Sequence, residues 1–472
     1  MIGRKAKFMR FIIAIFSVFA LFGAHAQNNL NMELIYQWKD TTLIPSADHG
    51  NPYNEIWGYT NDGREYAIIG STAGTHIFDI TDINNVDTVD FIAGKLQGDQ
   101  VIHRDYDTYQ DHLYIVCDEG ASSLQIADLS FLPDSAPVVY NSDDLIITSH
   151  NIFIDTVSGN LYTCGGATNL GPNFLSVYSL TTDPANPQFL INCSNDVPWW
   201  NSSIEYVHDI YVQNDTAYCN AGENGLFVVD FSDINSVQSL GSLTNYLQKG
   251  YNHSGWLHKS GNYYALADEN HGLDVKILDV TDLNDITLID TIGANVVDTL
   301  SIPHNLIFKD DNLYVSHYFD GIYVFNTSDV NNISLAGYYN TSTSVHAMNK
   351  YEGCWGVYPF LPSGKILASD MQEGLFVFNT TFPIGIDEEA ENDFTFIAYP
   401  NPARSTLTVT TTTLFSDVLP YTIYDLNGSV VSRGELSNSQ TKIDIQIFSS
   451  GFYAFSVVTA DGATITKKFI KE

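Results

Sequence analysis

Histidine recurs near the start of a repeated strand in this chain of 472 residues. The first strands of the seven repeats can be aligned on one apolar residue each. In three repeats a histidine stands two residues before that apolar residue, and in a fourth it stands one residue away from this position. These histidines are His150, His208, His304 and the offset His253. The same position holds Asn54 and Arg104 in the first two repeats, and the residue after it is acidic at Glu55, Asp105 and Asp209. By contrast, His49, His103 and His346 fall outside this register.

A second set of polar residues falls on the loops that join the second and third strands of the repeats. It comprises Asp118, Glu119, Glu223, Asp268, Glu269, Asp320, Asp370 and Glu373. Imidazoles beside carboxylates can bind a divalent cation, calcium or zinc, or can serve as general acid and base. His208, His304 and Asp268 are the candidate metal ligands, and no residue is assigned a catalytic role. The structural alternative is that repeated polar residues at strand starts bond to the backbone of neighbouring repeats.

The repeated unit that must position these residues is clearest at 207–243, where four short strand-like runs are separated by Asn, Asp and Gly. Its third strand ends in Asp or Asn, as in LFVVDFSDIN (226–235), VKILDVTDLN (275–284) and IYVFNTSDVN (322–331). That side chain suits an Asx turn, in which it bonds to the backbone two residues later. Seven such units predict an all-β chain with a seven-bladed β-propeller over residues 27–380. In that fold the first strands line a central channel, and both polar sets meet at one of its mouths.

The propeller is expected to close through its N-terminus. The last unit stops after its third strand, LFVFNTT (375–381), while MELIYQW (32–38) is a strand without a unit of its own. If 32–38 supplies the missing outer strand, the ring closes without an unpaired edge.

The first 26 residues have the features of a signal peptide. Four basic residues precede the apolar run FIIAIFSVFALF (11–22), and Ala24-His25-Ala26 is a small-x-small cleavage signal. The apolar run is short for a membrane span, and no later segment is uniformly apolar over the required length. We therefore expect an exported mature chain that begins at Gln27 and has no transmembrane segment.

The mature chain is strongly acidic. Without the signal peptide, 16 Lys and Arg face 55 Asp and Glu, a net charge of −39, and residues 394–472 hold six of each sign. The excess therefore lies in residues 27–393. Such a field repels phosphate backbones and anionic lipid surfaces, which argues against nucleic-acid binding.

Residues 381–393, TFPIGIDEEAEND, read as an acidic linker, and the alternating strands and turns of 394–472 predict a small C-terminal β-sandwich. Residues 394–472 resemble the type A C-terminal sorting domain of the type IX secretion system. The motif residues are Tyr399, Pro400, Asn401, Pro402, Gly428, Gly451, Lys467 and Lys468. The resemblance implies that 394–472 engages the type IX machinery for export, and that the chain is then attached to the cell surface or released.

The repeats resemble the LVIVD-repeat, choice-of-anchor B family over about residues 30–380. The segments that carry the resemblance include YNEIWGYTNDGREYAIIGSTAGTHIFDI (53–80), SHNIFI (149–154), PHNLIF (303–308) and GCWGVYPFLPSGKILASDMQEGLFVF (353–378). One departure is HRDYDTY (103–109), where the family usually has tryptophan before Arg-Asp. This resemblance implies no particular activity.

Three classes of function remain open. The first hypothesis is a secreted or cell-surface binding propeller that presents one polar face to an extracellular protein or glycan. The second is a metal-assisted hydrolase that uses the His/Asp/Glu face, and the third is a structural surface component. No Gly-rich phosphate loop, zinc-protease helix motif, serine-nucleophile elbow or Cys-x-x-Cys pair occurs in the sequence, which favours a protein that is not an enzyme.

Overall fold

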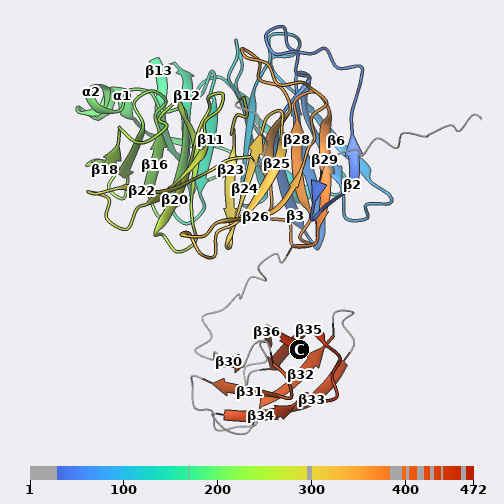
Figure 1. Cartoon of the computed structure of the whole chain (residues 1–472). Helices are drawn as coiled ribbons and strands as arrows, with labels where there is room; N and C mark the ends of the chain where they lie inside the picture. The colour runs from blue at the N-terminus through green and yellow to red at the C-terminus, as the bar shows by residue number, and fades with distance from the viewer. Residues whose placement is uncertain are drawn as a thin grey trace, which may run out of the picture. The chain divides into compact units, whose positions relative to one another are not determined.

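A computed structural model describes residues 29–169, 171–294, 300–382, 396–399, 403–411, 419–425, 430–436, 440–458 and 464–471 (Figure 1). The chain divides into two compact units, Met1–Gly385 and Ile386–Glu472. The predicted signal peptide and nearly all of the predicted linker lie outside the described residues.

The described part of the first unit is built almost wholly from antiparallel sheets. Six sheets have four strands and one has five. In this part of the chain the helical elements are single turns: η1 (Leu129–Phe131), α1 (Cys193–Asp196) and α2 (Trp200–Ser203). No helix among the described residues is long and apolar enough to cross a membrane.

The strands follow one another sheet by sheet along the chain. The first two sheets hold β3 (Tyr53–Asn61), β4 (Arg64–Ser71), β5 (Gly74–Asp79) and β6 (Asp87–Ala93), then β7 (Arg104–Tyr109), β8 (His112–Cys117), β9 (Leu124–Asp128) and β10 (Val138–Ser142). The next two hold β11 (Asn151–Asp155), β12 (Asn160–Thr168), β13 (Gly171–Ser179) and β14 (Gln188–Asn192), then β15 (Asp209–Gln213), β16 (Thr216–Asn220), β17 (Leu226–Asp230) and β18 (Gln238–Leu243). The fifth holds β19 (Asn252–Leu257), β20 (Tyr263–Asp268), β21 (Val275–Asp279) and β22 (Thr287–Ile292).

The last two sheets of this unit take strands from both ends of it. One contains β23 (Leu306–Lys309), β24 (Asn312–His317), β25 (Gly321–Asn326) and β26 (Ser334–Tyr339), extended by β1 (Asn29–Leu30). The other contains β27 (Cys354–Tyr358), β28 (Ile366–Asp370) and β29 (Gly374–Thr380), with β2 (Met32–Trp38) as its fourth strand. β2 pairs antiparallel with β29, from Met32 opposite Thr380 to Trp38 opposite Leu375. The pairing predicted for residues 32–38 is confirmed.

The first strands of the sheets contact one another in a closed cycle. β3 contacts β7, and the contacts continue through β11, β15, β19, β23 and β27 back to β3. Apolar side chains fill the space between neighbouring sheets: one cluster joins Ile68 and Ile77 of one sheet to Tyr106 and Ile115 of the next. The starts of the first strands are therefore held near one another.

The acidic or amide residue that ends most of the third strands forms the predicted turn. Oδ1 of Asp79 accepts a hydrogen bond from the backbone N–H of Thr81, and Asp230, Asp279 and Asn326 do the same two residues ahead. Part of the acidity of this chain is therefore structural.

The second unit contains two further antiparallel sheets. One has β30 (Phe396–Tyr399), β31 (Thr406–Thr411) and β34 (Gln440–Asp444), and the other has β32 (Leu419–Tyr424), β33 (Val430–Leu436), β35 (Gly451–Val458) and β36 (Thr464–Lys471). Leu407 and Ile443 of the first sheet share one buried cluster with Ile423, Phe455 and other residues of the second.

The closing strand provides a test of stability. Met32 of β2 is 3% exposed and packs with residues from two sheets, whereas the next residue, Glu33, faces solvent. Met32→Lys should lower the free energy of unfolding by at least about 2 kcal/mol, because it removes an apolar side chain and buries a charge. Glu33→Lys serves as the matched control and should leave the thermal midpoint nearly unchanged. Equal midpoints for the two variants would contradict the closure.

Candidate metal centre

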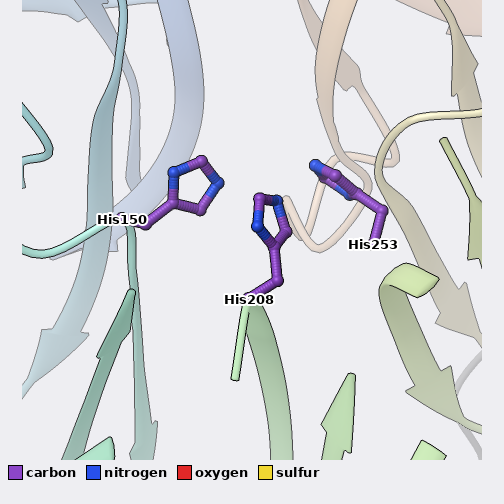
Figure 2. A group of neighbouring side chains, drawn as sticks. All are labelled: His150, His208 and His253. Atoms are coloured by element: carbon purple, nitrogen blue, oxygen red, sulfur yellow. The ribbon is translucent and has the colours of Figure 1, made fainter. Parts of the chain in front are cut away.

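Five histidines and one tryptophan form a closed ring of aromatic side chains at the starts of the first strands. Successive ring centroids lie 4.1 Å apart from His103 to His150, 4.0 Å from His150 to His208 and 4.4 Å from His208 to His253. The ring continues over 4.5 Å from His253 to His304 and 4.5 Å from His304 to Trp355, and closes over 5.2 Å from Trp355 to His103. Figure 2 shows His150, His208 and His253 converging from neighbouring elements.

The backbone at these positions is held by the second strand of the same sheet. The N–H groups of His150, His208 and His304 donate to the carbonyls of Cys164, Asn220 and Ser316, respectively. Each hydrogen bond continues the strand ladder past the last regular pair. The imidazoles therefore project from fixed backbone rather than from free loops.

Three overlapping groups of side chains place possible ligand atoms within 4.8 Å of one another. They are His150, His208 and His253; His103, Asp118 and His150; and His253, Glu269 and His304. The first group offers three nitrogen ligands, and each of the other two offers two nitrogens and a carboxylate oxygen. Imidazole nitrogens favour zinc and other transition metals over calcium, which prefers oxygen ligands.

Three of the imidazoles have one ring nitrogen held by a neighbour. Nδ1 of His150 donates to Oδ2 of Asp118 at 2.9 Å, and Nδ1 of His304 donates to the Trp355 carbonyl at 2.5 Å. Nδ1 of His208 lies 3.1 Å and 3.0 Å from the hydroxyls of Tyr206 and Tyr251. In each case the contact is made by Nδ1 and not by Nε2, as in metal sites where an outer partner orients the ligand imidazole.

Several of the remaining nitrogens are buried and lack hydrogen-bond partners among the described residues. These are Nε2 of His208, Nδ1 of His253 and Nδ1 of His103. The three side chains are no more than 7% exposed. A buried polar atom without a partner costs free energy, and a bound ion is one way to satisfy it.

Electrostatics keep most of the ring neutral. Burial lowers the pKa of His103, His208 and His253 well below the usual value, and neighbouring imidazoles add to that effect. Burial lowers the pKa of His304 to about 3. Burial also acts against protonation of His150, but the hydrogen bond and charge of Asp118, together with the charges of Asp209 and Asp105, outweigh it and raise that pKa. A neutral imidazole is the form that binds a metal ion.

The ring opens into a cavity of about 330 Å³. Around the histidines, its wall is formed by His49, Ile102, Asp118, Glu119, Glu269, Tyr318, Tyr351 and Trp355. Burial raises the pKa of Glu269 to about 7, even though the Tyr318 hydroxyl donates to it. The wall residues include neither lysine nor arginine.

The residues that follow the histidines line a second, smaller cavity of about 70 Å³. Its polar lining includes Glu55, Asp105, Asp107, Asn151, Asp209, Ser254 and Asn305. Burial raises the pKa of Glu55 and Asp209 to about 8 and of Asp105 to about 6, and in the first two cases the charge of Asp105 adds to the effect. Oδ2 of Asp105 accepts from Asn151 and from the Ile152 N–H, so this layer also links neighbouring sheets.

Most of the predicted site residues lie together. His150, His208, His253, His304 and Glu269 line the larger cavity, while Glu55, Asp105 and Asp209 line the smaller one. The residues that line the larger cavity and those that line the smaller one therefore form two adjoining layers, not a single site.

Seven of the predicted strand-start and loop residues line neither cavity, among them Asp320, Asp370 and Glu373. The Arg104 guanidinium donates to the carbonyls of Ser71 and Leu96, and Nδ2 of Asn54 donates to the Ile102 carbonyl. Asp268, predicted as a metal ligand, is fully buried in an ion pair with Lys276 at 2.6 Å and also accepts from the Tyr246 hydroxyl. Glu223 is exposed at its turn.

The register argument missed His103 and the partners that orient the ring. β7 has six residues where β11 and β15 have five, so the histidine of this sheet stands one place earlier, before Arg104. A one-residue tolerance in the alignment would have found it. Tyr206 and Tyr251 each stand two residues before a ring histidine, His208 and His253, and the register argument did not use that spacing.

A family model described as a secretion system C-terminal sorting domain matches residues 397–472. This confirms the sorting domain predicted near the C-terminus. Among the motif residues, Tyr399, Gly451, Lys467 and Lys468 fall on described strands, while Pro400, Asn401, Pro402 and Gly428 lie outside the described residues. The chain therefore carries a type IX secretion signal and is exported to the cell surface or the medium.

Solved structures share a general likeness with the chain. PorZ, a surface component of the type IX secretion system of Porphyromonas gingivalis, is 13% identical with a TM-score of 0.45; the match covers 91% of this chain and 61% of PorZ. The β-propeller domain of Swd1 from Myceliophteria thermophila is 10% identical (TM-score 0.49; 74% of this chain and all of that domain). The periplasmic gluconolactonase PpgL of Pseudomonas aeruginosa is also 10% identical, with a TM-score of 0.49; the match covers 83% of this chain and 98% of PpgL. At these identities no activity transfers to this chain.

A comparison with curated proteins finds no match.

The acidic layer generates a prediction about pH. Because the pKa of Asp209 is raised in the folded state, the unfolded chain releases this proton first as the pH rises from about 4 to about 8, and stability falls over that window. Asp209→Asn should therefore raise the free energy of unfolding at pH 8 by an amount on the order of 1 kcal/mol, and with it the thermal midpoint. At pH 4.5 the substitution should change the midpoint less.

Asp230→Asn is the matched control, because asparagine can keep the turn bond that Asp230 accepts from Ser232. It should shift the midpoint little at either pH. A lower midpoint for Asp209→Asn at pH 8 than for the unaltered chain would contradict the prediction.

Proposed function

We propose that the mature chain is a seven-bladed β-propeller that binds a divalent transition metal ion at one mouth of its channel. The blades are the sheets of residues 27–380, and the closed cycle of first-strand contacts supports this arrangement. Residues 1–26 are a cleaved signal peptide, 381–393 a linker and 394–472 a β-sandwich that engages the type IX machinery. The shared apolar cluster of its two sheets supports the sandwich.

One observation carries the metal-binding function. His150, His208 and His253 offer three ligand nitrogens within 4.8 Å of one another, and His208 and His253 each hold a buried nitrogen without a partner among the described residues. Stacked core histidines would satisfy these nitrogens with protein groups. A bound metal ion would satisfy the nitrogens through which it is held.

The surroundings favour zinc or a similar ion over calcium. The central group has no oxygen ligand, whereas calcium takes six to eight oxygens. Asp118 acts behind His150 through Nδ1, the arrangement of a carboxylate that orients a zinc-bound imidazole. The net charge of −39 on the mature chain also draws cations toward its surface.

The predicted binding of an extracellular protein or a glycan stays a prediction, as does a purely structural role. No contact of the described residues favours protein or glycan binding over a structural role.

Metal binding can be measured on the full mature chain by titration calorimetry and elemental analysis. His208→Ala should abolish stoichiometric zinc binding, because it removes the central ligand. Asp118→Asn should weaken zinc binding about 10- to 100-fold, since it alters the partner that orients His150.

His112→Ala is the matched control. His112 lies at the far end of β8 from Cys117, and its Nδ1 contacts the Gln110 carbonyl. This variant should bind zinc as the unaltered chain does. An unaltered chain that binds no zinc, or a His208→Ala variant that binds it equally well, would contradict the proposed function.

A further inference from the structure

The proposed metal centre has the ligand count of a catalytic site. Structural zinc sites use four protein ligands, whereas catalytic sites use three and leave a position for water or substrate. His150, His208 and His253 supply three nitrogens that face a cavity of about 330 Å³. An ion held by these three residues would therefore keep an open position toward the cavity.

A carboxylate stands beside His253, one of these three residues. Oε2 of Glu269 lies 3.9 Å from Nε2 of His253, and Oε1 accepts a hydrogen bond from the Tyr318 hydroxyl at 2.5 Å. The backbone N–H of Glu269 donates to the Tyr251 carbonyl, which fixes the base of the side chain. Glu269 is thus anchored through one oxygen, and the other faces the histidines.

The cavity wall limits the class of substrate. Asp118, Glu119 and Glu269 supply carboxylates, and the described lining contains no lysine or arginine that could pair with an anion. Phosphate and sulfate esters would therefore meet repulsion. Tyr318, Tyr351 and Trp355 supply aromatic surface, which suits an uncharged molecule.

We propose that this centre hydrolyses uncharged carboxylic esters, with Glu269 as the general base; the inference rests on the metal-binding function proposed above. Water at the open position loses a proton to Glu269 as its oxygen bonds to the ester carbonyl carbon. The bond from that carbon to the alkoxy oxygen then breaks, and the alkoxide leaves with the proton from Glu269. The products are one carboxylic acid and one alcohol.

The test uses the full mature chain loaded with zinc, and 4-nitrophenyl acetate and 4-nitrophenyl phosphate as probes. The loaded chain should hydrolyse the acetate faster than the same concentration of free zinc and leave the phosphate untouched. Glu269→Gln should lower kcat for the acetate about 100-fold or more with KM unchanged, and zinc binding should be retained. His208→Ala should lose both zinc and hydrolysis.

Glu223→Gln is the matched control, since Glu223 occupies the corresponding turn between β16 and β17 but is exposed to solvent. Its kcat should equal that of the unaltered chain. Zinc bound without acetate hydrolysis would overturn this inference and leave the metal-binding function standing, whereas absence of zinc binding would overturn both. Loss of zinc in Glu269→Gln would overturn the role of Glu269 as the base and make it a ligand. Hydrolysis of 4-nitrophenyl phosphate faster than that of 4-nitrophenyl acetate would overturn the proposed substrate class.

Discussion

The pairing of β2 with β29 is the constraint on which the rest of the first unit depends. It joins the N-terminal strand to the last repeat and so completes the sheet whose first strand is β27. β27 carries Trp355 and contacts both β23 and β3, the neighbours on either side. Without this sheet the cycle of first strands would be open, and the aromatic ring would lose the member that connects His304 to His103.

The closed cycle has an electrostatic consequence at its centre. Five imidazoles lie with successive centroids 4.0 to 4.5 Å apart, a spacing that like charges would make unfavourable. Burial keeps four of them neutral, and Asp118 compensates the one that takes up a proton more readily. Neutral, convergent imidazoles with unpartnered nitrogens are an arrangement that suits a metal ion better than a packed core.

Sequence patterns predicted the strands, the turn at the end of most third strands and four of the five ring histidines, because each depends on a repeated local feature. They also predicted the N-terminal closure, because the last repeat lacks one strand and residues 32–38 supply one. They failed where the position of a side chain depends on contacts with residues distant in the sequence. Arg104 occupies the ring register, but its long side chain reaches carbonyls of residues 71 and 96, and His103 takes its place. Asp268 lies on the predicted loop, but its carboxylate forms a buried ion pair with Lys276 and does not face the ring. Such outcomes depend on tertiary contacts that no local pattern records.

The position of a bound ion tests the central claim most directly. Crystals of the full mature chain grown with one equivalent of zinc should give a single strong anomalous peak at the zinc absorption edge. The account predicts this peak about 2.0–2.1 Å from one ring nitrogen of each of His150, His208 and His253, with Nε2 as the ligand atom of the first two. No peak inside the ring, or a peak that leaves Nε2 of His208 without a ligand bond, would contradict it.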